Sequence, residues 1–182
     1  MARNAKPQIL DGALELLRAQ GGRTITLDAT AKQVGLTKPG LMYHFPTKEA
    51  LMLAVVGHVA TRWEALLRER LGRPVESASA HQRIRAYVGV ALTERFDVAD
   101  FVIFSDAVYR DALTETWTRH LAPWVTLPDD LPEPARGRLT AARLLADGYW
   151  TAAATGVFPV PDHDRAGFLA VVEELLKEEA TS

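Results

Sequence analysis

Apolar residues recur at three- and four-residue spacing along most of the chain, which is the periodicity of amphipathic helices. The pattern predicts helices over about 5–20, 27–34, 38–45, 47–71, 79–94, 135–155 and 162–179, with a further aromatic-rich region over 98–121. No run of alternating apolar and polar residues indicates a strand. We therefore expect an all-α protein with about nine helices.

Glycine, proline and threonine set the boundaries of the first three predicted helices, of which the second and third are short. Gly21-Gly22 ends the first helix, and Thr26 is a candidate N-cap of the second. Gly35 supplies the left-handed backbone that ends the second helix. Phe45-Pro46 ends the third, because the residue before a proline is disfavoured in helical backbone. This order of helix, glycine, short turn and helix is the helix-turn-helix arrangement.

The third predicted helix has only about two turns, a length at which an isolated helix is marginal in water. A DNA major groove, about 12 Å wide, accepts a helix of which only two turns are exposed, provided that neighbouring helices hold it. We expect Leu41 and Phe45, four residues apart, to dock this helix on its neighbours. Pro39 and Gly40 give its first turn a low profile, so the backbone there could approach base edges closely.

Polar groups next to this helix suit the phosphates of DNA. Tyr43 and His44 carry hydrogen-bond donors, and Lys48 adds a cation to the first turn of the following helix. The net charge of −2 is unevenly distributed, because residues 1–50 carry seven Lys or Arg against four Asp or Glu. This N-terminal excess of positive charge weakly favours an anionic partner.

The residues Thr26, Val34–Lys38 and Gly40–Leu51, in this order, resemble the DNA-binding domain of the TetR family of bacterial transcriptional regulators. The resemblance covers about the first 55 residues. It implies a helix-turn-helix domain over 1–46 and a helical ligand-binding and dimerisation domain over 47–182, joined by the long helix. The stretch Gly40–Pro46 further resembles a subgroup that contains repressors of multidrug efflux genes.

The resemblance also implies roles for individual residues in DNA binding. Phosphate contacts are implied for Thr26, Thr37, Tyr43, His44 and Lys48, and base contacts for Lys38, Pro39 and Gly40. Lys38 is the candidate for direct readout, since it could reach guanine O6 and N7. Gly40 departs from the family pattern, where a small β-branched or hydroxyl residue is frequent. Met42 also departs from the family pattern, since tyrosine is frequent at this position. The change removes a phosphate contact, for which Tyr43 could compensate.

Aromatic residues are dense in the C-terminal part of the chain. Candidates for lining a ligand cavity are Trp63, Tyr87, Phe101, Phe104, Tyr109, Trp117, Tyr149 and Trp150. Rings with polar tips suit a planar apolar ligand, while the alternative is that these side chains simply fill the core. Asp106, Asp147 or Glu94 near such a cavity would favour a cationic ligand.

The last two predicted helices carry apolar stripes. These consist of Leu139, Ala142, Leu145 and Ala146 on the first and Phe168, Val172, Leu175 and Leu176 on the second. The resemblance implies that the two helices pair with their copies in a homodimer, whereas the alternative buries them within one subunit. Two-fold symmetry would place the recognition helices about 34 to 36 Å apart on a palindromic operator.

Several classes of protein find no support in the sequence. The absence of cysteine excludes disulfides, thiolate zinc sites and cysteine nucleophiles. The sequence Asp162-His163-Asp164 is better explained as a helix start with acids in its first turn than as a metal site, and we expect no metal or cofactor. No glycine-rich phosphate loop or nucleophile with a base indicates an enzyme. No export signal or run of about 18 apolar residues is evident, so we expect a cytoplasmic protein without a membrane span.

The expected function is therefore that of a homodimeric, ligand-responsive repressor of transcription. It would bind a palindromic operator in double-stranded DNA and release it when a small aromatic or apolar effector enters the C-terminal domain. The helix over 47–71, with Lys48 near one end and Trp63 toward the other, would couple the two sites. The alternatives are a helical protein–protein interaction module, which would show no salt-sensitive DNA binding, and an enzyme of the C-terminal domain, which would show turnover.

Overall fold

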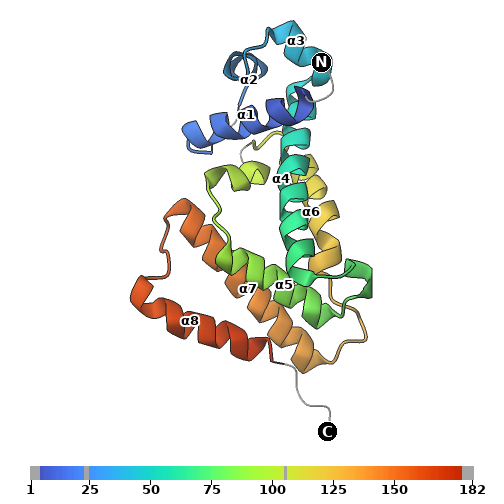
Figure 1. The fold of residues 1–182 in the computed structure, drawn as a ribbon, viewed down its shortest axis with the longest axis vertical. Coiled ribbons are helices and arrows are strands. Elements are labelled where there is room, and N and C mark those ends of the chain that lie inside the picture. Colours follow the sequence, from blue (N-terminus) through green and yellow to red (C-terminus); the bar gives the residue numbers. More distant parts are fainter. Residues whose placement is uncertain (1–4, 23–24, 105, 178–182) are drawn as a thin grey trace. The chain divides into compact units, whose positions relative to one another are not determined.

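The computed structural model describes residues 5–22, 25–104 and 106–177, without the side chains of 102–104. Within these residues it contains eight α-helices, two 3-10 helices and no strand (Figure 1). The elements are α1 (Ala5–Ala19), α2 (Leu27–Gln33), α3 (Lys38–His44), α4 (Lys48–Leu71), η1 (Val75–Ser77), α5 (Ala80–Thr93), η2 (Val98–Phe104), α6 (Arg110–Val125), α7 (Glu133–Thr155) and α8 (Asp162–Leu175). The predicted all-α fold is confirmed.

Most helix ends lie within two residues of the sequence-based expectation, but the ends of α6 and α8 differ by more. The aromatic-rich region was expected to end at residue 121, but α6 continues to Val125 with Pro123 inside it. Burial of Trp124 favours this extension, and Arg83 donates hydrogen bonds to the carbonyl oxygens of Pro123 (2.7 Å) and Thr126 (3.1 Å) at the helix end. The last helix ends at Leu175, and the predicted continuation over 178–179 lies outside the described residues.

The chain packs as two compact units. Unit 1 consists of Met1–Trp63 and Asp97–His120, and unit 2 of Glu64–Phe96 and Leu121–Ser182. The predicted DNA-binding domain over 1–46 thus belongs to a larger packing unit, which adds the first part of α4 and a separate stretch from η2 into α6. Helices α4 and α6 each contribute residues to both units.

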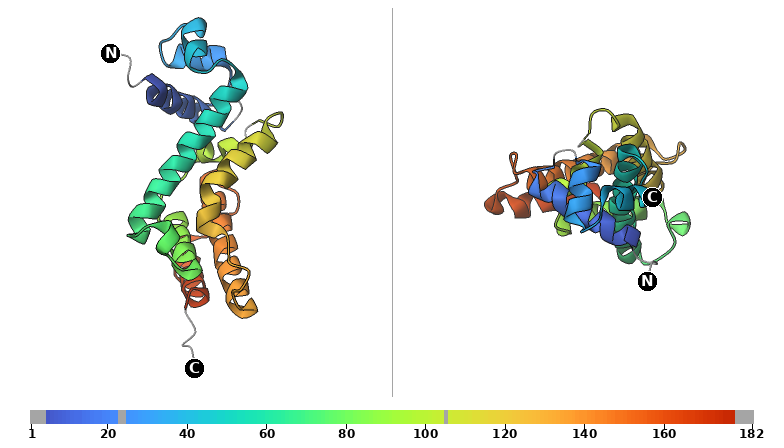
Figure 2. Two further views of the ribbon diagram at one scale, coloured as in Figure 1. Left: turned by 90° about the vertical axis from the view of Figure 1, so that its right-hand side faces the viewer. Right: turned by 90° about the horizontal axis from the view of Figure 1, so that it is seen from above.

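In unit 1, α1, α2 and α3 gather around the beginning of α4, and α1 crosses it (Figures 1 and 2). Ile9, Leu17, Leu41 and Leu51 are almost completely buried and form the core between these helices. Glycine at position 12 of α1 allows close packing against Val34, because a Cβ atom there would lie 2.3 Å from Val34 Cγ1. The short helices α2 and α3, of seven residues each, are therefore held by tertiary contacts rather than by their intrinsic propensity.

Among the described helices, α4 is the one that is long and apolar enough to cross a membrane by length and composition alone. Its apolar residues have a more direct explanation within the protein. Leu51, Val55, Val59, Trp63 and Leu67 are all at most 1% exposed. This is the burial pattern of a core helix. Length and composition alone are therefore weak evidence that α4 spans a membrane.

In unit 2, α7 packs against both α5 and α8. A polar group is buried at the α5–α7 contact, where the Tyr87 hydroxyl donates to Asp147 Oδ1 at 2.6 Å. Asp147 Oδ2 accepts from Arg143 at 2.6 Å. Burial, followed by the negative charge of Asp147 and the hydrogen bond to it, raises the pKa of Tyr87 well above its ordinary value of about 10.

Replacing Tyr87 with phenylalanine should lower the free energy of unfolding at pH 7 by about 1 to 3 kcal/mol, because Asp147 loses a hydrogen bond. Below pH 10 the tyrosine is neutral in both states, so its contribution is complete. Above pH 10 the unfolded chain ionises first, and wild-type stability falls as the pH rises toward the folded-state pKa. The stability gap between wild type and variant should therefore narrow in urea unfolding at pH 10.5.

The matched control is Tyr149→Phe. The Tyr149 ring stacks on Phe168 with ring centroids 5.3 Å apart, and its hydroxyl makes no hydrogen bond with the described residues. Its removal should leave stability nearly unchanged at both pH values. If the difference in the free energy of unfolding between wild type and Tyr87→Phe stays constant from pH 7 to pH 10.5, burial does not raise the pKa of Tyr87 as described.

Candidate nucleic-acid interface

Threonines cap three consecutive helices of unit 1 in the same way. The backbone N–H donors and threonine Oγ1 acceptors are Ala29 to Thr26 (3.1 Å), Gly40 to Thr37 (3.2 Å) and Ala50 to Thr47 (3.0 Å). A hydroxyl that accepts such a bond still has its own hydrogen to donate. Thr26 and Thr37 are exposed, so each could cap its helix and donate to a phosphate oxygen at the same time.

The turn between α2 and α3 is built on Gly35, which has a φ of +68°. The Leu36 N–H donates to the Ala31 carbonyl at 2.8 Å and the Gly35 N–H to that of Lys32 at 3.3 Å, so the last carbonyls of α2 are satisfied. This confirms the predicted glycine stop. Leu36, the residue that follows, is 37% exposed.

Helix α3 has a buried side and an exposed side. Leu41 and Phe45 are buried, as their spacing predicts. Lys38, Pro39 and Tyr43 are exposed, and Tyr43 keeps 86% of its surface accessible. The Tyr43 ring meets His44 edge to face, with centroids 5.2 Å apart. The expected division between docking residues and outward-facing polar residues is thus present in the fold.

Gly40 stands where the family pattern frequently has a small β-branched or hydroxyl residue. A Cβ atom at this position would meet Thr37 Oγ1 at 3.2 Å and Leu36 Cβ at 4.0 Å. A small side chain would need a shift of only a few tenths of an ångström. The glycine therefore keeps the first turn of α3 without a side chain that would press on the capping hydroxyl of Thr37.

The two candidate lysines differ in how firmly they are held. Lys38 Nζ lies 2.8 Å from Asp28 Oδ2, and both side chains are at least half exposed. Such surface pairs contribute little, about 0 to 1 kcal/mol, so Lys38 could leave Asp28 for a base. Lys48 Nζ lies 2.5 Å from Asp106 Oδ2, and Asp106 is only 6% exposed. Lys48 is thus held by a buried carboxylate rather than being a free cation beside the helix start.

The stretch after α5 supplies further acidic partners to unit 1. Asp97 Oδ2 lies 2.5 Å from Arg18 of α1, and Asp100 Oδ1 lies 2.5 Å from Arg62 of α4. Asp100 is almost fully buried, and burial raises the pKa of its carboxyl group. Together with Asp106, these residues connect a distant part of the sequence to the helices of the candidate DNA-binding end.

The sequence pattern does not indicate Asp28 and Asp106 as partners of the two lysines. Asp28 lies ten residues from Lys38, across the turn between α2 and α3, and the helix-turn-helix arrangement could have suggested the pair. Asp106 is 58 residues from Lys48. No local pattern connects residues at that separation.

The eight candidate ligand-lining aromatics are divided between the units. Trp63, Phe101, Phe104, Tyr109 and Trp117 belong to unit 1, and Tyr87, Tyr149 and Trp150 to unit 2. The side chain of Phe104 lies outside the described residues. Trp63 is completely buried and meets Trp117 edge to face at 5.8 Å. This arrangement matches the core interpretation for Trp63.

The aromatics of unit 2 also pack against protein. Trp150 lies 5.6 Å from Phe96, Tyr149 stacks on Phe168, and Tyr87 is buried on Asp147. Two of the three acids that could have favoured a cationic ligand already have cationic partners, since Arg143 pairs with Asp147 and Lys48 with Asp106. Nothing in these contacts reserves a carboxylate for a ligand.

The candidate dimerisation residues fall into two groups. Leu139, Ala142, Ala146, Val172 and Leu176 are buried within the single chain, where they hold α7 and α8 in unit 2. Leu145, Phe168 and Leu175 are partly exposed. The most exposed large apolar residues on these two helices are Leu144 and Val171, neither of which the apolar stripes had included.

Comparisons with known proteins agree with this arrangement. HTH-type transcriptional regulator RutR of Escherichia coli K12 is 36% identical over 63 residues, which are 35% of this chain and 30% of that protein. An uncharacterized HTH-type transcriptional regulator in the dhlA 5′ region of Xanthobacter autotrophicus is 29% identical over 144 residues, covering 68% of this chain and 69% of that protein. The match to RutR thus spans less than a third of that relative.

Solved structures share the fold along nearly the whole chain. A TetR-family transcriptional regulator from Rhodococcus sp. superposes with a TM-score of 0.68 at 18% identity, covering 94% of this chain and 98% of that chain. A structure described as multidrug binding protein EbrR complexed with imidazole gives 0.61 at 18% identity, covering 97% of both chains. At such identities the likeness concerns the fold.

Two family models match the sequence directly. The model "Bacterial regulatory proteins, tetR family" matches residues 9–55, which contain α2, α3 and the turn between them. The model "Tetracyclin repressor-like, C-terminal domain" matches residues 81–177, more than half of the chain. With both matches in their expected order, the protein belongs to the TetR family of bacterial regulatory proteins.

Proposed function

We propose that this protein is a cytoplasmic, homodimeric repressor that binds a palindromic operator in double-stranded DNA through α3. The observation that carries the proposal is the two-sided character of α3. Leu41 and Phe45 anchor the helix, while Tyr43 projects with 86% of its surface exposed. Exposing a large aromatic residue on a well-anchored helix is of no benefit to the core, but it suits a phosphate contact that orients the helix.

The proposed contacts fall into two sets. Thr26, Thr37, Tyr43 and His44 would bind phosphates, with the two threonine hydroxyls donating while they cap their helices. Lys38, Pro39 and Gly40, in the first turn of α3, would lie against the base edges. Lys48 would join the phosphate contacts when it exchanges Asp106 for the DNA backbone.

The dimer would form through the outward surfaces of α7 and α8. Leu144 and Val171 are exposed there, and Leu145, Phe168 and Leu175 are partly exposed beside them. A two-fold interface between these helices would present two copies of α3 to the two halves of a palindrome. The buried members of the predicted stripes would support this surface from within.

The proposed regulation is release of the operator when a small molecule binds. EbrR, which shares the fold, is described as a multidrug binding protein, which supports a small-molecule effector for this chain too. Helix α4 is the candidate coupling element, since it runs unbroken from Lys48 to Leu71 and contributes to both units. Such couplings typically amount to about 1 to 3 kcal/mol, and saturating operator should weaken effector binding by the same factor.

The test is a mobility-shift titration on DNA upstream of the protein's own coding sequence, at several salt concentrations. Tyr43→Ala should weaken specific binding at least ten-fold. Two half-sites each lose a hydrogen bond to a charged acceptor, about 1.5 kcal/mol or more apiece, and about 1.4 kcal/mol corresponds to a factor of ten. Tyr43→Phe should reproduce most of the loss if the hydroxyl is responsible.

The matched control is Phe158→Ala, which removes another highly exposed aromatic side chain, outside unit 1. It should bind the operator like wild type. Unchanged affinity in Tyr43→Ala would refute the placement of α3 on DNA. Absence of any salt-sensitive DNA binding would favour a protein-interaction module instead.

A further inference from the structure

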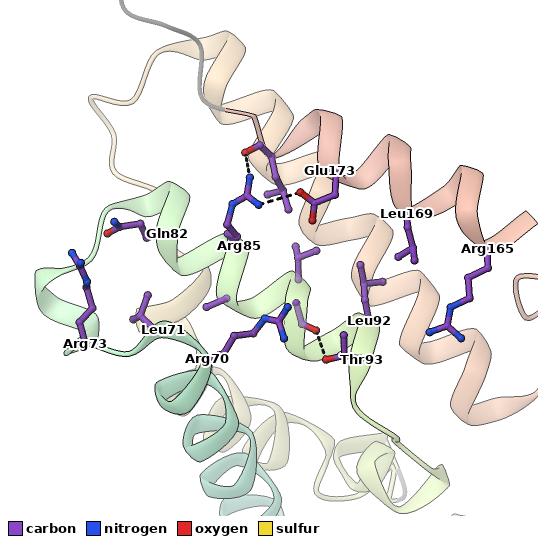
Figure 3. Close-up of a pocket in the computed structure, with 14 residues that line it drawn as sticks. Arg70, Leu71, Arg73, Gln82, Arg85, Leu92, Thr93, Arg165, Leu169 and Glu173 are labelled. Atoms are coloured by element: carbon purple, nitrogen blue, oxygen red, sulfur yellow. Dashed lines mark hydrogen bonds and ion pairs between the residues drawn. The ribbon is translucent and has the colours of Figure 1, made fainter.

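Unit 2 contains a cleft of about 730 Å³ that none of the candidate aromatic residues lines. Its walls come from the end of α4, from α5 and from α8 (Figure 3). Leu92 of α5 and Leu169 of α8 contribute apolar surface inside it. The volume lies within the range of about 300 to 1,000 Å³ that is usual for small-molecule sites.

The cleft is strongly basic, although the whole chain carries a net charge of −2. Arg70, Arg73, Arg85 and Arg165 line it against a single acid, Glu173. Arg85 already has partners within the protein, since its guanidinium group lies 3.1 Å from Glu173 Oε2 and 2.6 Å from the Leu176 carbonyl oxygen. Along the described parts of the chain, no carboxylate lies within ion-pair distance of the other three arginines.

Arg70 is positioned by a glycine in the middle of α5. A Cβ atom on Gly89 would lie 1.8 Å from Arg70 Nε and 2.3 Å from its Cζ. The guanidinium group therefore rests against the α5 backbone, where any larger residue would displace it. Glycine inside a helix is less favourable than alanine by about 1 kcal/mol, so this close approach comes with a local loss of helix stability.

Arg70 and Arg165 approach the apolar surface from different helices. In the view of Figure 3 their guanidinium groups lie on either side of Leu92 and Thr93. A guanidinium group binds carboxylate or phosphate oxygens through paired N–H donors, and the pairing is stronger than a neutral hydrogen bond. Arg70 and Arg165, which have no ion pair among the described residues, thus form with the neighbouring leucine side chains a site with a cationic part and an apolar part.

We propose that this cleft binds an amphipathic organic anion. The carboxylate or phosphate head would pair with Arg70 and Arg165, and the apolar body would lie against Leu92 and Leu169. This ligand class differs from the cationic aromatic ligand suggested by composition. A nucleic acid fits less well, because the arginines surround a concave cleft rather than following an extended stripe.

Binding itself does not depend on the proposed DNA-binding function, but identifying the cleft as the effector site rests on it. An anion that neutralises Arg70 would act at the C-terminal end of α4. The same helix begins with Lys48 in the candidate DNA-binding end. The amphipathic anion would then be the molecule that releases the operator.

Isothermal titration calorimetry on the full chain can test the binding, with decanoate and decyl phosphate as probes below their aggregation concentrations. At least one should bind saturably at one site per chain. Decanol, which lacks the charge, decyltrimethylammonium, which reverses it, and inorganic phosphate, which lacks the tail, should each bind at least ten-fold more weakly. The preferred probe distinguishes a carboxylate head from a phosphate head.

Two kinds of variant locate the site. Arg70→Gln and Arg165→Gln should each weaken binding about ten-fold, while Arg119→Gln, which alters an exposed arginine outside the cleft, should not. Gly89→Ala keeps every charge but displaces the Arg70 guanidinium, so it should weaken binding several-fold without loss of thermal stability. Equal binding of decanol, or binding by wild type that these variants leave unchanged, would overturn the proposal.

Adding the bound probe to the operator complex separates the two hypotheses. Release of the DNA at concentrations matching the calorimetric affinity supports both. An operator complex with no saturable binding of either anionic probe overturns the inference about the cleft alone. Anion binding by a protein that binds no DNA supports the cleft and contradicts the proposed function.

Discussion

Replacing Leu41 with alanine should remove operator binding by undocking α3. Leu41 is completely buried, and Leu-to-Ala substitutions in a core typically lower the free energy of unfolding by about 2 to 5 kcal/mol. Helix α3 has seven residues, too few to persist without its anchor. We therefore expect both a clear loss in urea unfolding and a loss of operator affinity of at least ten-fold in the mobility-shift assay.

Met42→Ala is the neighbouring control, since Met42 is partly exposed and faces away from the core. It should change the free energy of unfolding by no more than about 0.5 kcal/mol. A Leu41→Ala protein that retains wild-type operator affinity would show that the docking of α3 does not determine DNA binding.

Lys48→Ala should destabilise the protein, in addition to any effect on DNA. The substitution leaves the carboxylate of Asp106 buried without the cation that lies 2.5 Å away. Breaking a fully buried pair typically destabilises by about 3 to 5 kcal/mol. Because Lys48 is partly exposed, we expect about 2 to 3 kcal/mol in urea unfolding at pH 7.

The double variant Lys48→Ala with Asp106→Asn separates the two effects. It removes the buried negative charge of Asp106, while an amide oxygen can still accept the Val108 N–H, 3.0 Å away in the wild type. Stability should recover by at least half, whereas operator binding should remain weak. Asp106→Asn alone should release Lys48 and give tighter, more salt-sensitive operator binding. Equal stability of wild type and Lys48→Ala would contradict this account of the pair.

Local sequence patterns predicted the candidate DNA-binding end well, because short-range chemistry determines it. Gly35 ends α2, threonines begin α2 and α3, and Leu41 and Phe45 are buried four residues apart. Each of these features depends on residues within a few positions of one another. The matched segment, residues 9–55, coincides with this region.

Features that depend on distant residues could not be predicted in the same way. Lys48 is held by Asp106, and Pro123 remains helical because Trp124 is buried and Arg83 satisfies the helix end. The basic cleft unites Arg70 with Arg165, nearly a hundred positions apart in the sequence. The periodicity of apolar residues predicts whether a side chain is buried or exposed. It does not predict which charged residue from a distant part of the sequence lies beside that side chain.

The division of unit 1 into two stretches of sequence has a consequence for recombination between regulators. Arg18, Lys48 and Arg62 precede residue 63, whereas their carboxylate partners Asp97, Asp100 and Asp106 follow residue 96. A chimaera joined once in α4 after Arg62 would take the cations from one parent and the carboxylates from the other. To combine unit 1 of one regulator with unit 2 of another, Asp97–His120 has to be transferred together with the N-terminal helices. The coding sequence of this structural unit is therefore discontinuous in the gene.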